Sequence, residues 1–220
     1  AGTRSEEITL FGGSASYNRL ENSDFAYVRG LVLSLSMIET NGFSASLDYT
    51  FQIAKGSASD PQQARNAIAG GSLPEIQLTP LDWDQRNTVN MSLAYDRANW
   101  GISGIGQFGS GLPYTPLSTE DISSLVLNSG KKPLTWNVDL KGYFIPRDGL
   151  RLFIRAENIF DRLNPYTVYD DSGVADFTRW ENIAKSQNTG EPVNSISKWF
   201  LNETFYSNPR RIELGLSYVF

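Results

Sequence analysis

Apolar and polar residues alternate along one stretch of this chain after another, and this pattern restricts the possible folds more than any other feature. Between positions 42 and 54, every second residue from Phe43 to Ile53 is apolar, and the residues between them are polar. Successive side chains of a β-strand point to opposite faces, so this stretch predicts a strand with one apolar and one polar face. The pattern recurs at 24–38, 89–95, 100–108, 134–140, 150–156 and 212–220, and more weakly at 8–17. The sequence therefore predicts an all-β fold of about eight strands.

The predicted strands are long, and short and long connections alternate between them. Most strands extend over about 11 residues, which suits a tilted strand that spans a bilayer, whereas globular strands have about 5–6. Turn residues form short connections at 39–42, 96–99 and 145–149, and long connections cover 55–86, 110–133 and 161–209. In an antiparallel meander this order places every long loop at one end of the sheet. Transmembrane β-barrels of the outer membrane have this layout, with the long loops outside the cell.

A soluble β-sandwich would also alternate, with its apolar faces packed in a core. Two features favour the membrane barrel. The predicted polar faces are rich in Ser, Asn, Thr and Gly, as a crowded barrel interior would be, and they carry little Lys or Glu. Aromatic residues also gather near the predicted strand ends, like the aromatic belts at membrane interfaces. These residues are Tyr49, Phe51, Tyr95, Trp100, Phe108, Trp136, Phe144, Phe160, Tyr218 and Phe220.

The turn at 145–149 also predicts a strand register. If Phe144 and Leu150 face each other across this turn, Asp139 lies opposite Arg155 on the polar face. Opposite charges that face each other across a ladder contribute roughly 0.2–1 kcal/mol. We therefore expect Asp139 and Arg155 to be neighbours.

Composition excludes several classes of function. No apolar run reaches the roughly 18 residues that a membrane-spanning helix needs. The net charge of -5 and the pI of about 4.8 provide no basic surface for nucleic acid. The chain has neither cysteine nor histidine, so it offers no disulfide, no thiolate metal site and no Ser-His-Asp triad. We expect neither an enzyme nor a metal or cofactor site.

Two groups of residues are candidates for function. Charged residues on the predicted polar faces could line a substrate path or pair with one another to set the register: Asp139, Lys141, Arg151, Arg155, Glu157, Arg211 and Glu213. Aromatic residues of the loop at 161–209 could contact an extracellular ligand or pack the loop onto the barrel rim. The candidates for ligand contact are Tyr166, Tyr169, Trp180, Trp199 and Phe200. Helical spacing from Ile196 to Glu203 predicts a short helix in the same loop.

Four short motifs resemble one family, the TonB-dependent outer-membrane receptors. The stretch 151–166 (RLFIRAENIFDRLNPY) is similar to that family's penultimate strand, with Ile159 where leucine is typical. The stretch 78–95 (LTPLDWDQRNTVNMSLAY) resembles a loop-to-strand segment, with Asn87 where histidine is common. The stretches 109–116 (GSGLPYTP) and 208–220 (NPRRIELGLSYVF) resemble its Ser-Gly-x-Pro-Tyr-Thr motif and its closing strand.

This resemblance implies that residues 1–220 form the C-terminal portion of a barrel of about 22 strands, with a plug domain that lies upstream of Ala1. The implied function is TonB-energised uptake, at the bacterial outer membrane, of a nutrient too large for porins, of the siderophore, oligosaccharide or peptide class. The implied partners are the rest of the barrel and the plug, the TonB complex acting through the plug, the barrel-assembly machinery, the bilayer with its lipopolysaccharide, and a surface lipoprotein. The alternative is a structural or adhesive barrel subunit that does not transport.

The last residues also resemble a signal that the barrel-assembly machinery reads. Glu213, Gly215, Tyr218 and Phe220 stand at its polar, glycine and two hydrophobic positions. We therefore expect Phe220 to be the native C-terminus.

Overall fold

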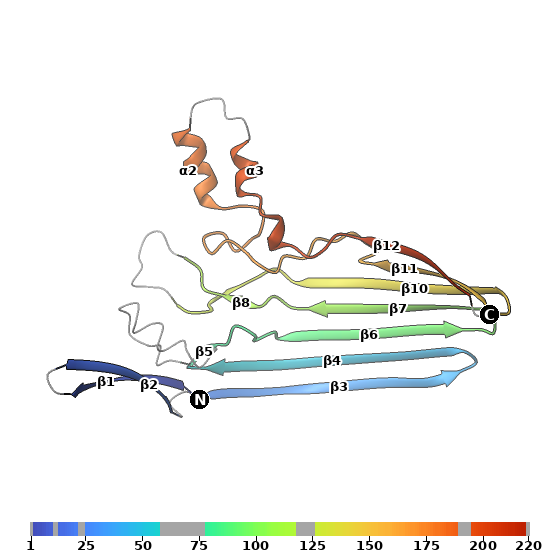
Figure 1. Ribbon diagram of the computed structural model, residues 1–220, viewed down its shortest axis with the longest axis horizontal. Coiled ribbons are helices and arrows are strands. Elements are labelled where there is room, and N and C mark those ends of the chain that lie inside the picture. The colour runs from blue at the N-terminus through green and yellow to red at the C-terminus, as the bar shows by residue number, and fades with distance from the viewer. Residues whose placement is uncertain are drawn as a thin grey trace.

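The computed structural model describes residues 25–57, 78–117, 126–188 and 195–218, and the backbone alone of residues 2–10 and 13–21. Its main element is one antiparallel sheet in which seven long strands follow the order β12-β11-β10-β7-β6-β4-β3. Each of these strands lies beside its neighbours in the sequence, so the sheet is a meander (Figure 1). The long strands are β3 (Ala26–Thr40), β4 (Phe43–Gly56), β6 (Asn87–Asp96), β7 (Trp100–Gly109), β10 (Thr135–Arg147), β11 (Leu150–Glu157) and β12 (Arg211–Tyr218). The antiparallel all-β prediction is confirmed.

Several short strands and helices accompany the sheet, mostly at the end where the long loops lie. The two-residue strand β5 (Thr79–Pro80) pairs with β4, and β8 (Pro113–Tyr114) pairs with β9 (Gly130–Lys131). The longest loop carries α2 (Arg179–Gln187), α3 (Ile196–Phe200) and the 3-10 helix η2 (Glu203–Phe205). The sequence pattern predicted α3 but missed α2. Within the described ranges, no helix is both long enough and apolar enough to cross a membrane.

The single opening strand predicted at 8–17 is wrong. The chain instead forms a separate hairpin of β1 (Gly2–Leu10) and β2 (Gly13–Glu21), in which Ile8 faces Ala15. Residues 8 and 15 therefore belong to two strands that run in opposite directions. Alternation alone could not reveal this, because a tight turn between two strands can preserve the alternating pattern.

The turns collect at one end of the sheet, and the long loops with α2 and α3 collect at the other (Figure 1). In the two-residue turn between β3 and β4, Thr40 faces Phe43, and Asn41 and Gly42 have positive φ values of 54° and 84°. A two-residue hairpin turn of this kind needs two residues that tolerate the left-handed conformation, and Asn-Gly is a preferred pair. This asymmetry of turns and loops agrees with the connection lengths in the sequence.

The predicted pairing of Asp139 with Arg155 is wrong by two residues. Arg155 faces Lys141, and the register shifts between Phe144 and Arg147 because a bulge interrupts the ladder there. The actual turn is therefore only two residues long. Two like charges face each other as a result, and Arg155 turns to Glu213 on β12, with Nη1 and Oε2 3.6 Å apart.

The register divides the apolar face into bands that run across the strands. Near the loop end, facing residues form a row that contains three aromatic side chains: Leu33, Tyr49, Val89, Phe108 and Trp136. Two further rows lie near the turn end. One contains Phe43, Tyr95 and Ile102, and the other contains Trp100, Phe144, Leu152 and Leu216. Aliphatic and small residues fill the rows between. Along β10, the eight steps from Trp136 to Phe144 correspond to about 27 Å, close to the apolar band of about 25 Å in membrane barrels once strands tilt.

Little of this apolar face is buried. Among the described residues, the fully buried hydrophobic side chains are Ala54, Leu81, Val168 and Ala175, and they lie at the loop end or in the loops. By contrast, Leu214 remains 80% exposed in the middle of β12. The core of this chain therefore anchors its loops, while the sheet presents its apolar face outwards.

Two glycines on the polar face lie under aromatic rings of the next strand. Gly101 faces Tyr143, and Gly215 faces Phe153. A side chain at either glycine would collide with that ring. Phe153 interrupts the apolar-polar alternation of β11, and this contact explains why: its ring covers the backbone of Gly215, a device that stabilises glycine in a strand.

Candidate functional site

The long loop after β11 begins at a turn that Asn158 and Asp161 build. Both residues have left-handed backbones, with φ of 50° and 54°, which Asn and Asp tolerate better than most residues. The Asn158 amide donates to the carbonyl oxygens of Arg162 at 2.9 Å and Asn208 at 3.1 Å. Asp161 Oδ1 accepts the backbone N–H of Arg210 at 2.8 Å. The Asn-Ile-Phe-Asp motif therefore joins the outgoing and returning ends of the loop.

Asn164 attaches the same loop to the first residues of β10. Its Oδ1 accepts from the backbone nitrogen of Trp136 at 3.0 Å, and its Nδ2 donates to the Trp136 carbonyl at 2.8 Å. The Trp136 ring packs against Phe160 with centroids 5.4 Å apart, and the Arg162 guanidinium carbon lies 5.3 Å from its centroid. The side chain of Asn164 thus continues the hydrogen-bond ladder where β11 has already ended.

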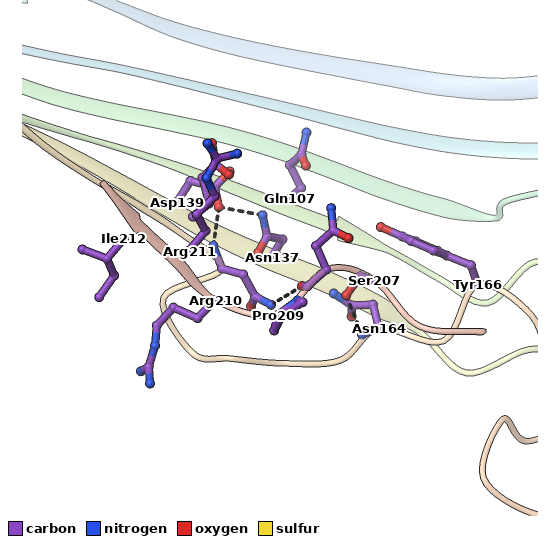
Figure 2. A pocket seen from close by; sticks show the side chains of 13 residues that line it. Gln107, Asn137, Asp139, Asn164, Tyr166, Ser207, Pro209, Arg210, Arg211 and Ile212 are labelled. Atoms are coloured by element: carbon purple, nitrogen blue, oxygen red, sulfur yellow. Dashed lines mark hydrogen bonds between the residues drawn. The ribbon is translucent and has the colours of Figure 1, made fainter. Parts of the chain in front are cut away.

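These contacts enclose a polar cavity of about 720 Å³ between β10, the loop base and the start of β12 (Figure 2). Asn137 and Asp139 form its floor: Asn137 Nδ2 donates to Asp139 Oδ1 at 2.8 Å, and Asp139 Oδ1 also accepts the backbone N–H of Asn158 at 2.7 Å. The Asn137 Oδ1 atom is buried and has no hydrogen-bond partner in the described structure. An orphaned buried acceptor is costly, so a ligand group or water that donates to it would be stabilised.

A second cavity of about 210 Å³ adjoins the first and shares Gln107, Asn137, Asn164 and Tyr166 with it. The register explains why amides gather here. Asp48, Asn90, Gln107 and Asn137 face one another in one row across β4, β6, β7 and β10. The next row towards the turn end contains Ser46 and Ser92, whose hydroxyl oxygens are 2.7 Å apart. A surface of amide and hydroxyl groups therefore extends along the polar face to the cavity.

Four of the seven predicted polar-face charges form a cluster on β11 and β12. Glu213 makes ion pairs with both Arg155 and Arg211. Glu157 faces Arg211 across the ladder. Opposite charges therefore face each other across the last two strands, and whether they line a substrate path or set the register stays a prediction.

The other three predicted charges lie elsewhere. Asp139 is in the floor of the cavity, as described above, and Lys141 lies opposite Arg155. Arg151 is near the turn end, where its guanidinium carbon lies 4.1 Å from the centroid of the Tyr143 ring. The seven charges therefore do not form one continuous network.

The five aromatic candidates of the loop differ in exposure. Trp199 on α3 is 85% exposed and Trp180 on α2 is 54% exposed, and Tyr166 lines both cavities. Tyr169 instead donates its hydroxyl to the Phe200 carbonyl, and burial raises the pKa of Tyr169. Three of these side chains can reach a ligand, while the Tyr169–Phe200 bond holds the loop together.

The helical part of this loop has its own polar supports. Thr178 is the N-cap of α2, and Asp171 Oδ2 supports it by accepting from the Thr178 hydroxyl at 2.8 Å and from the Arg179 backbone nitrogen at 2.7 Å. Glu181 on α2 accepts from Ser197 Oγ on α3 at 2.6 Å, and Lys185 Nζ lies 2.7 Å from the same oxygen. Hydrogen bonds from Lys185 and then Ser197 lower the pKa of Glu181 from its ordinary value of 4.5.

The stretch 78–95 reveals a second loop anchor. Asp84 is only 2% exposed; its Oδ1 accepts the Ala54 backbone N–H at 2.8 Å, and its Oδ2 accepts from Arg86 Nε at 2.7 Å. The neighbouring Asp82 accepts from the Asn128 side chain at 2.6 Å, which links this loop to the next one. Alternation did not single out these residues, although the Asp-Gln-Arg motif contains Arg86. Within the described ranges, no three Asp or Glu side chains gather as metal ligands would.

The residues of the predicted assembly signal lie on both faces of β12. Gly215 lies under the Phe153 ring, and Tyr218 faces Leu150. The Arg147 guanidinium carbon lies 5.7 Å from the centroid of the Tyr218 ring. Phe220 is outside the described residues, so its place in the signal stays a prediction.

No family profile and no curated protein matches the chain. Solved structures do match, and three of them are receptor complexes. They are the ferripyoverdine receptor of the outer membrane of Pseudomonas aeruginosa bound to ferripyoverdine (12% identity, TM-score 0.52), P. aeruginosa FpvA bound to heterologous pyoverdines (13%, 0.53) and an FpvAI–pyocin S2 complex (14%, 0.53). Each match covers 98% of this chain and 23% of the receptor chain. The chain therefore has the fold of part of an outer-membrane receptor and spans about a quarter of the receptor chain.

Proposed function

We propose that this chain forms part of the wall of an outer-membrane receptor that imports a solute too large for porins. In this proposal the apolar face contacts lipid, and the polar face lines the barrel interior. Substrate enters from the end where the long loops gather, and the cavity at the base of the longest loop is one of its contact points. A plug domain fills the interior, and the TonB complex acts on this plug to open the path.

One observation carries this proposal. A single register places a row of four amide or carboxylate side chains across four strands, and this row leads into the cavity beneath the loop. The opposite face of the same strands is apolar and bounded by two aromatic bands. A structural barrel wall needs the apolar face, but it needs neither a polar row nor an orphaned acceptor in a cavity.

The polar lining favours a solute rich in hydrogen-bond donors. The siderophore, oligosaccharide and peptide classes all have this property. The solved receptors with this fold are bound to ferripyoverdine, to heterologous pyoverdines or to pyocin S2. We therefore place the siderophore class first. Tyr166, Trp180 and Trp199 are the proposed aromatic contacts, because their rings are exposed at the same end of the sheet as the cavity.

The proposed partners follow from the same arrangement. The edges of β3 and β12 require further strands, because an unpaired strand edge is not tolerated in a bilayer. We propose that the rest of the barrel supplies them, and that the barrel-assembly machinery inserts the closed structure. Lipopolysaccharide and a surface lipoprotein are the proposed neighbours at the loop end.

Uptake of a radioiron-labelled siderophore panel by cells that produce the full-length protein tests this function. We expect uptake that stops when a protonophore collapses the energy supply, with binding retained. Tyr166→Ala should weaken binding about tenfold or more, as removal of an interface aromatic does. Asn188→Ala is the matched control, because Asn188 is exposed at the end of α2 and lies far along the loop from the cavity.

Binding that survives while energised uptake is absent in all conditions would indicate a receptor or adhesin that does not transport. Equal effects of Tyr166→Ala and Asn188→Ala would remove the cavity from the proposed binding site. Oligosaccharide and peptide panels, assayed in the same cells, decide between the substrate classes.

A further inference from the structure

Two arginines at the turn end of the sheet are held against tyrosines of the apolar face. Arg97 donates from Nε to the Tyr95 hydroxyl at 2.7 Å, and its guanidinium carbon lies 5.0 Å from the centroid of the Tyr95 ring. Arg147 lies in the same way over Tyr218, at 5.7 Å. Tyr95 belongs to one of the turn-end rows, and Tyr218 faces Leu150 one row further towards the turns, so both guanidinium groups lie at the boundary of the apolar face.

Among the described residues, no carboxylate forms an ion pair with either guanidinium. The ion pairs among the described residues involve Arg86, Arg155, Lys185 and Arg211, and none involves Arg97 or Arg147. Asp148 follows Arg147 directly in the turn, yet the two side chains form no ion pair. Asp96 precedes Arg97 but lies on the polar face, where it accepts from the Tyr143 hydroxyl at 2.9 Å. Both cations are exposed and retain donors for an anion.

The two turns that carry these arginines are joined. The Ile145 backbone nitrogen donates to the Asn99 carbonyl at 2.7 Å, and Trp100 faces Phe144 across β7 and β10. β6 and β10 are separated by β7 alone, so their ends lie about 10 Å apart. The two guanidinium groups therefore lie at the same end of the apolar face, one over β6 and the other over β12, with β7, β10 and β11 between these two strands.

We infer that Arg97 and Arg147 bind the phosphate groups of anionic phospholipids in the leaflet that the short turns face. The guanidinium fork matches phosphate oxygens, and the apolar rows beneath it accept the acyl chains of the same molecule. This combination distinguishes a lipid from a soluble phosphate, which would use only the guanidinium groups. The inference rests on the membrane placement in the proposed function, and it adds a lipid site at the end opposite to the solute cavity.

A matched control exists within the same chain. Arg151 also stacks on a tyrosine, Tyr143, and at a shorter distance of 4.1 Å, but this pair lies on the polar face. If the lipid site depends on the apolar face, Arg151→Gln should leave lipid binding unchanged. The same substitution at Arg97 and Arg147 should weaken it.

The test uses the full-length protein in phosphatidylcholine vesicles that contain a minor share of phosphatidylglycerol. Bromine atoms on the acyl chains of one lipid or the other quench nearby tryptophans, and Trp100 is the reporter because its ring lies 5.5 Å from that of Tyr95. Subtracting the quenching measured for Trp100→Phe isolates the signal of Trp100. Heat-modifiable mobility in gels verifies that each variant is folded.

We expect phosphatidylglycerol to bind near Trp100 more tightly than phosphatidylcholine, and each arginine to contribute about fivefold to this preference. Arg97→Gln should lower the preference about fivefold, and the double variant with Arg147→Gln should lower it further. A preference that persists in the folded double variant would overturn the inference, as would an equal loss in Arg151→Gln. Loss of the preference on addition of inorganic phosphate would identify a soluble-anion site and overturn the lipid assignment. Quenching by neither lipid would instead contradict the membrane placement itself.

Discussion

The Asn164 side chain makes the two backbone hydrogen bonds to Trp136 that a residue of a neighbouring strand would otherwise make. Its side-chain amide accepts from the Trp136 nitrogen and donates to the Trp136 carbonyl, at 3.0 and 2.8 Å, on the side of β10 that β11 has left uncovered. The Asn164 backbone also bonds in both directions to Ser207, which returns from the far end of the loop. One buried asparagine thus connects β10 with both ends of the 158–210 loop.

Removal of the Asn164 amide should release this loop from the sheet. Asn164→Ala leaves both backbone groups of Trp136 without partners, at a cost of about 1–3 kcal/mol. Hydrogen exchange at the Trp136 amide should accelerate, and limited proteolysis within the loop should become faster. Asn188→Ala, which removes an exposed amide from the end of α2, is the control and should change neither measurement. Unchanged exchange in Asn164→Ala would show that the rest of the loop base holds it without this amide.

The contact between Phe153 and Gly215 should appear as a compensating pair. Gly215→Val places a branched side chain where the Phe153 ring lies, and overpacking of this kind costs about 1–3 kcal/mol. We expect a smaller fraction of folded, heat-modifiable barrel after membrane extraction. Phe153→Ala combined with Gly215→Val should recover part of that fraction, and the double-mutant cycle measures the coupling. If the destabilising effects of Gly215→Val and Phe153→Ala simply add, the Phe153 ring does not restrict the side chain at position 215.

The packing of α2 against α3 should weaken in acid. The folded-state pKa of Glu181 is lowered from 4.5 by Lys185 and Ser197, so the unfolded loop binds the proton more readily. The stabilisation from Glu181 is therefore complete above about pH 5 and is lost as the pH falls through the folded-state pKa. Fluorescence of Trp180 and Trp199 should report the change. Glu181→Gln should remove this acid transition and loosen the loop at neutral pH, whereas Glu203→Gln, on exposed η2, should leave the transition in place.

Deletion of Phe220 should reduce assembly without changing the ligand site. The residue stands at the last position of the predicted assembly signal, and only the start of β12, at Arg211 and Ile212, lines the cavity. We expect a several-fold lower amount of protein in the outer membrane, measured by membrane fractionation. The assembled part should bind ligand with unchanged affinity. Normal membrane levels combined with weaker binding would contradict an assembly role.

The sequence pattern predicted a structural element correctly where that element depends only on residues close together along the chain. The period-2 alternation from Phe43 to Ile53 predicts β4 because each side chain of a strand alternates in direction, whatever the partner strand is. The Asn41-Gly42 turn follows from the backbone preferences of those two residues, and α3 follows from helical spacing. The family motifs also led correctly to the barrel fold, which the solved receptor structures share.

The predictions that depended on which residues face each other across strands were wrong. Asp139 and Arg155 are not neighbours, because β10 continues to Arg147, so that the turn has two residues instead of five, and a bulge between Phe144 and Arg147 then shifts the register by one residue. The hairpin of β1 and β2 was read as one strand for a related reason, since alternation does not mark a tight turn. The helix α2 has a local start signal that hydrophobic periodicity does not detect: Thr178 accepts from the Trp180 backbone nitrogen, and Glu181 follows in the first turn.

By itself, the sequence determined that the chain forms long two-faced strands joined alternately by short turns and long loops, because these properties depend on residues close together along the chain. Only the tertiary structure decided which polar groups meet. The row from Asp48 to Asn137 joins four strands, and the cavity joins Asn137 with Asn158 and Arg210. Such contacts depend on strand register and on loop closure over tens of residues, and hydrogen bonds such as those of Asn164 select them only once the sheet has formed.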